Sequence, residues 1–344
     1  MHGVDVQEPF PFPALKYLDL ETNEGTTFVI PDAFLGGSAP LLQRVRLCGI
    51  QFPSLPKLLS STSNLVRLSL NSIPMTGEGH ISPDAMTTYL SVLTKLRSLN
   101  LTFRRQSSSP YPADQHPTAS TRIVLPALVD LWLEGPHGYL EDLVGRVDAP
   151  LLTSGRLEFY DEPIFDTPRV PQFLHRSKMF KSLGKFEVYF RRKSIVASFR
   201  PSSRRAKFYL SFQCSGLPAQ GAIMEQICAQ WLPLVSHVGL LKPDDPFRTE
   251  EKWWEAVTPW LGFLRPFTTV QTLRLCGTAT MSHVAHVLGE LKGERVKEVL
   301  PVLRTIEVDC LQQGASEILR LLRPFLVTRE DLGHPVVVKV GYEV

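Results

Sequence analysis

Two small groups of residues have side chains that could do metal or acid–base chemistry. His283 and His286 stand three positions apart in a segment expected to be helical, so both could reach one metal ion. A third ligand at a useful spacing is missing, and two ligands are too few for a zinc site. Asp161, Glu162 and Asp166 could bind a cation or exchange protons, but they lie in a proline-flanked loop without the spacing of a calcium loop. We therefore expect solvated side chains at both places, with no metal and no cofactor.

The rest of the sequence contains no catalytic motif. It lacks a glycine-rich phosphate-binding loop, a G-x-S-x-G nucleophile elbow and an H-E-x-x-H zinc motif. No apolar run approaches the roughly 18 residues of a membrane span, and no signal-peptide pattern opens the chain. The five cysteines are far apart and form no C-x-x-C pair. These features predict a non-enzymatic intracellular protein, cytoplasmic or nuclear, without a membrane partner.

A basic segment covers residues 191–207. Its seven Lys and Arg residues, with no acidic residue among them, are Arg191, Arg192, Lys193, Arg200, Arg204, Arg205 and Lys207. The segment could bind nucleic acid, act as a nuclear import signal, or be a solvated hairpin whose charges discourage pairing between strand edges. The hairpin interpretation is favoured over the import signal. Nucleic acid comes last, because the net charge is only +3 and the rest of the chain has no matching basic stripe.

The elements that would position such residues follow a leucine pattern. In residues 125–135, Leu128, Leu131 and Leu133 have the spacing L-x-x-L-x-L. Leu131 and Leu133 alternate with Asp130, Trp132 and Glu134, which is typical of a strand with one buried face. Copies of the pattern recur roughly 23 to 35 residues apart, near the 20 to 29 residues of leucine-rich repeats. Their expected buried residues include Leu18, Val45, Leu68, Leu99, Leu131, Phe186, Leu273 and Ile306.

Helix-sized segments separate most of these strands. Ser82 is a plausible N-cap, and Pro83 suits the first helical position, where its missing N–H has no consequence. Strands alternating with helices at this period predict parallel strands. The expected fold is therefore α/β: a leucine-rich-repeat-like solenoid, a curved parallel sheet with helices on the convex side and an antiparallel β insertion near the middle.

Two interruptions divide the expected solenoid. Residues 103–122 are rich in Ser and Pro and predict a long exposed loop within an N-terminal arm, residues 1–180. Residues 181–215 contain three β-like runs with short links and predict an antiparallel meander. A C-terminal arm would then cover residues 216–344.

The chain resembles a large protein family found in mushroom-forming fungi. The resemblance is carried by several segments, including YLEDLVGRVDAPLL at residues 139–152 and PIFDTPRVPQFLHRS at residues 163–177. The members of this family are F-box proteins with leucine-rich-repeat-like C-terminal regions. The resemblance implies repeats that hold a substrate for a Skp–cullin ubiquitin ligase. An F-box would fill some 40 to 50 residues, and the first repeat strand is expected from about Phe12. We therefore expect binding to the Skp adaptor only if an upstream F-box exists.

The concave face of the expected sheet is the predicted surface for another protein. Large or charged residues at positions that core packing does not require are Trp132, Glu134, Arg156, Tyr160, Tyr189 and Tyr209. Trp, Tyr and Arg are enriched in binding hot spots because they bury much area and keep a polar handle. An alternative is that a loop of the same chain, such as residues 103–122, covers these aromatic side chains.

Overall fold

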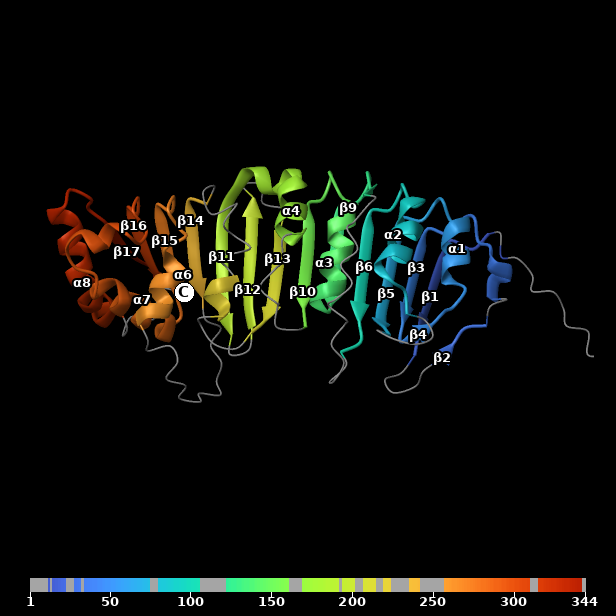
Figure 1. Cartoon of the computed structure of the whole chain (residues 1–344), viewed down its shortest axis with the longest axis horizontal. Coiled ribbons are helices and arrows are strands. Elements are labelled where there is room, and N and C mark those ends of the chain that lie inside the picture. The colour runs from blue at the N-terminus through green and yellow to red at the C-terminus, as the bar shows by residue number, and fades with distance from the viewer. Residues whose placement is uncertain are drawn as a thin grey trace, which may run out of the picture. The chain divides into compact units, whose positions relative to one another are not determined.

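The computed structural model describes residues 12, 14–22, 28–31, 34–74, 80–105, 122–160, 169–191, 194–201, 207–214, 219–223, 235–241, 257–309 and 315–341. The chain forms two compact units. Figure 1 shows the helices and strands that they contain. Unit 1 comprises Met1–Tyr160 and Gln172–Lys178, and unit 2 comprises Asp161–Pro171 and Met179–Val344. Both units combine helices with mostly parallel strands, which confirms the predicted α/β class.

The strands of unit 1 lie in parallel, in the order in which they occur in the chain. They are β1 (Tyr17–Glu21), β3 (Arg44–Cys48), β5 (Arg67–Ile73), β6 (Ser98–Phe103), β8 (Asp130–Gly135) and β10 (Ser154–Phe159). The register places the middle apolar residues opposite one another in one row: Leu18, Val45, Leu68, Leu99 and Leu131. All five are buried, as predicted from the repeated spacing.

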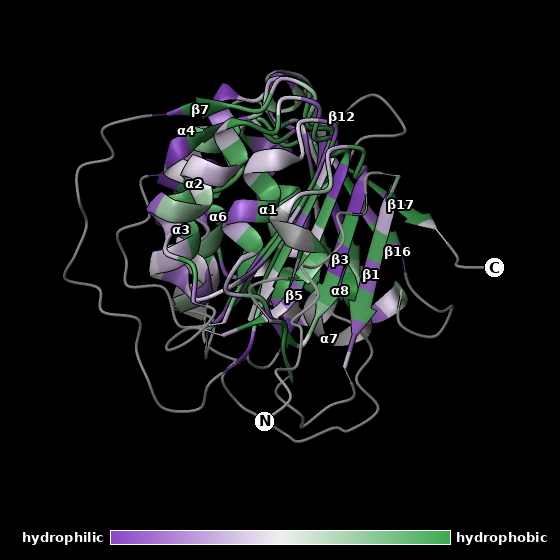
Figure 2. Ribbon diagram, turned by 90° about the vertical axis from the view of Figure 1, so that its right-hand side faces the viewer, coloured by the Kyte–Doolittle hydropathy of each residue, from purple (hydrophilic) through white to green (hydrophobic). Residues whose placement is uncertain are grey.

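Helices cover one face of these strands, and the other face carries the alternate side chains (Figure 2). The described helical elements of unit 1 are η1 (Phe34–Gly37), α1 (Leu55–Ser61), α2 (Pro83–Ser91) and α3 (His137–Arg146). Four short strands form two further parallel pairs. In the first pair β2 (Phe28–Val29) lies beside β4 (Ile50–Gln51), and in the second β7 (Ile123–Val124) lies beside β9 (Val147–Asp148). The Ser82 hydroxyl accepts a hydrogen bond from the Ala85 N–H at 3.2 Å, which confirms the predicted N-cap of α2. We call the face that the described helices leave uncovered the open face.

Unit 2 begins with three antiparallel strands. They are β11 (Leu183–Arg191), β12 (Ser194–Pro201) and β13 (Lys207–Gln213), and alternating residues predicted their antiparallel pairing. On the other side of β11 follow the parallel strands β14 (His237–Leu241), β15 (Thr272–Cys276), β16 (Thr305–Asp309) and β17 (Val337–Gly341). Phe186, Val238, Leu273 and Ile306 form one buried row across them. Sequence analysis did not predict β17.

Aromatic rings fill the core beneath the antiparallel strands. The Phe180 ring centroid lies 5.4 Å from that of Phe199 and 5.2 Å from that of Phe208, in edge-to-face contacts. The helical elements of unit 2 with both ends in the described ranges include η2 (Lys178–Ser182), α6 (Val257–Leu264), α7 (Thr278–Gly289), η5 (Gly293–Lys297) and α8 (Ala315–Asp331). Helix α4 (Arg169–Arg176) has residues in both units. Among the described residues, no helix is long and apolar enough to cross a membrane. The predicted loop at residues 103–122 falls mostly outside the described residues.

Candidate functional site: a polar cluster on the open face of unit 1

Trp132 lies in the middle of β8 on the open face, and 42% of its surface is exposed. Its direct neighbour on β10 is Arg156, whose guanidinium carbon stands 5.2 Å from the centroid of the indole ring. A guanidinium over an aromatic face is attracted by the negative charge of the ring surface. The pair therefore forms an ordered, half-exposed platform of aromatic and positive character.

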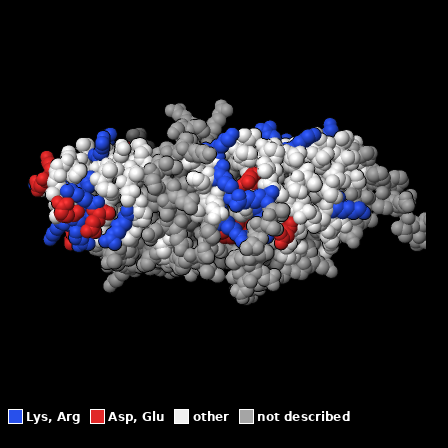
Figure 3. All heavy atoms as spheres, turned by 45° about the horizontal axis from the view of Figure 1, so that its top comes forward, with Lys and Arg blue, Asp and Glu red and all other residues white. Residues whose placement is uncertain are grey.

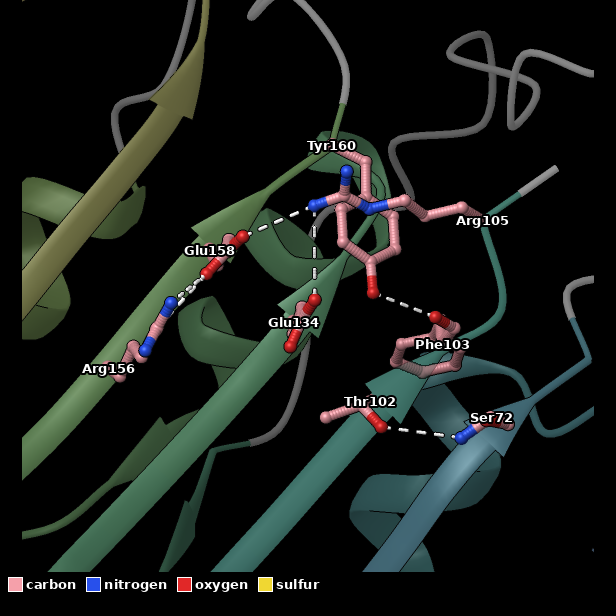
Figure 4. A network of polar contacts seen from close by, with 8 residues as sticks. All are labelled: Ser72, Thr102, Phe103, Arg105, Glu134, Arg156, Glu158 and Tyr160. Atoms are coloured by element: carbon pink, nitrogen blue, oxygen red, sulfur yellow. Dashed lines mark hydrogen bonds and ion pairs between the residues drawn. The ribbon is translucent and has the colours of Figure 1, made fainter. Parts of the chain in front are cut away.

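Two carboxylates stand next to this platform, directly opposite each other. Glu134 on β8 is in register with Glu158 on β10, and like charges at directly opposed positions repel. Arg105 relieves the repulsion, because its guanidinium lies 3.2 Å from the Glu158 carboxylate and 4.0 Å from that of Glu134 (Figure 4). The Nε of Arg156 adds a hydrogen bond to Glu158 at 3.1 Å. Each carboxylate is thus paired with a guanidinium.

Tyr160 closes the cluster at the end of β10. Its hydroxyl donates a hydrogen bond to the carbonyl oxygen of Phe103 at 2.8 Å, and the Arg105 guanidinium carbon stands 4.4 Å above its ring. Burial raises the pKa of Tyr160, and the nearby charge of Glu134 raises it further. The phenol therefore stays protonated and acts as a hydrogen-bond donor.

The ends of three strands must lie close together for these contacts to form. A Cβ atom on Gly135 would approach Phe103 Cδ2 to 2.6 Å, so only glycine lets β8 pass so near this ring. The Phe103 ring packs at 4.3 Å, centroid to centroid, against Tyr139 of α3. Beyond Phe103, the Ser72 N–H donates to Thr102 Oγ1 at 3.3 Å, which links the network to β5 (Figure 4). We call Arg105, Trp132, Glu134, Arg156, Glu158 and Tyr160 the Trp132 cluster.

The structure brings four of the six predicted partner-binding residues into this cluster, and the other two lie in unit 2. Tyr189 of β11 is half-buried, and its hydroxyl donates to Glu187 Oε2 at 3.2 Å. Burial and the Glu187 charge raise the pKa of Tyr189. Tyr209 of β13 is half-buried opposite Ser198. Tyr189 thus belongs to a separate polar network around Glu187, and Tyr209 lies on a strand of the same unit.

That second network is centred on a buried carboxylate. Glu187 is 3% exposed and lies 2.8 Å from Lys185 Nζ and 3.0 Å from the Arg200 guanidinium. Burial alone would raise the pKa of Glu187, but Lys185, Arg200 and the Tyr189 hydroxyl outweigh it and lower the pKa. Arg200 of the predicted basic segment is therefore occupied by an internal ion pair.

Other predicted residues have no shared site in the described part of the chain. Arg191 and Lys207 are exposed strand ends, whereas Arg192, Lys193, Arg204 and Arg205 lie outside the described residues. The same holds for the acidic group Asp161, Glu162 and Asp166. His283 is half-buried and His286 is exposed on α7, and no group of three His, Cys, Asp or Glu residues suited to a metal occurs within the described ranges.

Sequence reasoning placed Glu158 on the concave face but not among the candidate binding residues, and it did not single out Arg105. Both residues complete the Trp132 cluster. The position of Glu158 could be predicted because alternate residues of a strand point to the same face. No such pattern marks Arg105, since it lies 53 positions before Glu158 and follows the end of β6.

Comparison with known proteins adds no family to this picture. No protein-family model matches the chain, and no curated protein is significantly similar to it in sequence.

Proposed function

We propose that this chain is a non-catalytic protein–protein interaction scaffold, built as a leucine-rich-repeat-like solenoid whose sheet binds a partner protein. The role would be similar to that of the substrate-binding repeat region of F-box proteins in Skp–cullin ubiquitin ligases, which the sequence resembles. The parallel register of the strands and the helices on one face of each unit support the repeat architecture.

The observation that carries the proposal is the exposed Trp132 on the open face. Its neighbours in the buried rows, Leu131 and Leu133, have their side chains in the core, so the fold does not need an indole at position 132. Large aromatic side chains flanked by ordered arginines are enriched at the energetic centres of interfaces. The surrounding ion pairs would form the polar rim that excludes water around such an anchor.

Cluster residues are already held in place before any partner arrives. Arg156 is fixed by Glu158, and Arg105 by Glu158 and Tyr160. A preorganised side chain loses less conformational entropy on binding than a free one. We place the partner surface here rather than at the plain polar strands β3 and β5.

The test compares two similar stacked pairs on the same face of unit 1. Trp132→Ala with Arg156→Ala removes the proposed anchor. Tyr17→Ala with Arg44→Ala removes a pair with the same 5.2 Å stacking distance across β1 and β3. Proteins that co-purify with the wild-type chain should be lost from the first variant and kept by the second. Equal retention by both variants would show that the Trp132 cluster is not the binding surface.

A further inference from the structure

The outermost strands of the two units leave a backbone edge without a partner among the described residues. In the strand order, β1 begins the run of unit 1 and β17 ends the run of unit 2. Every residue of β17 is exposed or half-buried, and Val337 is 59% exposed. An exposed edge strand with unpaired backbone groups is a template for pairing with another strand.

Hydrogen-bond alternation identifies which backbone groups are available. The Val337 N–H donates to the Arg304 carbonyl at 2.9 Å, so Val337 uses its backbone toward β16. Alternate residues of a parallel strand point their N–H and C=O groups to opposite sides, which leaves those of Val338 and Val340 at the free edge. Just before β1, the Lys16 carbonyl accepts a hydrogen bond from the Arg44 N–H of β3. The backbone N–H and C=O groups of the even-numbered residues of β1 therefore point toward β3, and those of the odd-numbered residues point to the free edge.

The two free edges fit each other in one register. Parallel pairing of β17 with β1 of a second copy places Val338 opposite Leu18 and Val340 opposite Leu20. The buried rows of both sheets then run on without a break, since Val338 pairs with Ile306 and Leu18 with Val45 within each copy.

Charges on the open face match in the same register. Arg274, Glu307 and Lys339 are neighbours across β15, β16 and β17, and Asp19 is a neighbour of Arg46 across β1 and β3. Joining the edges would place Lys339 beside Asp19. Positive and negative side chains would then alternate along one row: Arg274, Glu307, Lys339, Asp19 and Arg46. Opposite charges at directly opposed positions stabilise strand pairs. Apart from this row, Figure 3 shows Lys and Arg intermingled with Asp and Glu at the end that carries α8, where Lys297 pairs with Glu294 and Arg320 with Glu317.

We propose that copies of this chain associate head to tail, with β17 of one copy pairing in parallel with β1 of the next. Antiparallel pairing of two β17 strands over their full length would instead place Lys339 opposite Lys339 and is disfavoured by like-charge repulsion. The contact joins two different surfaces, so a pair of copies keeps one free edge at each end, and association continues into open chains or closes into a ring.

Two proline variants block one edge each without breaking an internal ladder bond. Val340→Pro removes an N–H from the free edge of β17, and Asp19→Pro removes one from the free edge of β1; proline is tolerated at edge positions of this kind. Sedimentation velocity of the full chain should show a mass that rises with concentration above the 38.7 kDa monomer. Each variant alone should remain monomeric. An equimolar mixture should form a discrete dimer, because each variant supplies the edge that the other lacks.

Every other result contradicts the head-to-tail contact. A wild-type chain that stays monomeric, or a mixture that does, shows that the edges do not pair. A dimer of Asp19→Pro alone indicates pairing between two β17 strands, and a dimer of Val340→Pro alone indicates pairing between two β1 strands. If circular dichroism shows that a proline variant does not fold, charge-reversal variants take its place in the experiment. Lys339→Glu and Asp19→Lys should each weaken association, and the double variant should restore it.

Discussion

Arg329 of α8 is a charged side chain that is 1% exposed, and it forms no ion pair with an acidic side chain in the described part of the chain. Its guanidinium donates to the carbonyl oxygens of Val296, Pro301 and Leu303 at 3.4, 3.2 and 3.0 Å. Burial lowers the pKa of Arg329. The side chain ties the segment between η5 and β16 to α8, so its role is structural.

Replacing Arg329 with methionine should destabilise the protein. Methionine keeps the length but leaves three carbonyl oxygens unsatisfied, and an unsatisfied buried acceptor costs roughly 1–3 kcal/mol. We expect the free energy of unfolding, measured by urea titration, to fall by about 3 kcal/mol or more. Arg320→Met on the same helix, at an exposed ion pair with Glu317, should change it by less than about 1 kcal/mol. Similar effects of the two substitutions would refute the anchoring role.

Glu187 predicts how stability depends on pH. The pKa of this carboxyl is lowered in the folded protein, whereas in the unfolded chain it titrates near its ordinary value of about 4.3. The unfolded state therefore takes up the proton first as pH falls, so the contribution is present above the unfolded pKa and is lost as pH falls through the folded pKa. The urea midpoint of Glu187→Gln should fall less steeply below about pH 5 than that of the wild type.

An exposed carboxyl supplies the control for this pH experiment. The hydrogen bond from Arg320 lowers the pKa of Glu317, but both groups are exposed on α8. Because salt screens exposed pairs, Glu317→Gln should leave the acid limb of the profile almost unchanged. Parallel profiles for the wild type and Glu187→Gln would rule out the buried network as a source of acid sensitivity.

At the scale of elements, β8 carries a buried core face and, on its other side, the proposed partner-binding face. Leu131→Ala should cost roughly 2–5 kcal/mol, because it opens a cavity in a packed row. Trp132→Ala, one residue along, should cost no more than about 1 kcal/mol, since the indole is 42% exposed. Chemical denaturation of the two variants measures both values. A larger loss for Trp132→Ala than for Leu131→Ala would mean that the indole belongs to the core.

The strands that sequence analysis predicted are those with a strong alternation of leucines. Leu68, Leu99 and Leu131 stand directly opposite one another because each occupies the same place in its L-x-x-L-x-L copy. Sequence analysis did not predict β17, because its sequence VVKVG lacks that spacing. In the structure, Val338 and Val340 are only half-buried. A one-sided strand at the end of a run has a weaker pattern, since it packs against one neighbour instead of two.

At the scale of the whole molecule, the candidate site combines predictable and unpredictable parts. Trp132 and Arg156 could be placed on the outward face, because residue parity along a strand decides the face. That they stand directly opposite follows from the register between strands, and the capture of Glu158 by Arg105 depends on a side chain beyond a strand end. Such contacts arise from three-dimensional stacking and leave no local spacing in the sequence.

The most direct test of the proposed binding surface is site-specific photo-cross-linking in living cells. Photoreactive benzoylphenylalanine would replace Asp130 in one variant, Tyr17 in a second and Arg320 in a third, all three of which are exposed positions. Asp130 stands two residues before Trp132 on the same face of β8, so the probe leaves the proposed anchor in place. The account predicts that position 130 gives a discrete cross-linked partner, whereas Tyr17 on the same open face and Arg320 on α8 do not give that adduct. An adduct with the same partner from α8, or none from position 130, would contradict the assignment of the open face of unit 1 as the partner-binding surface.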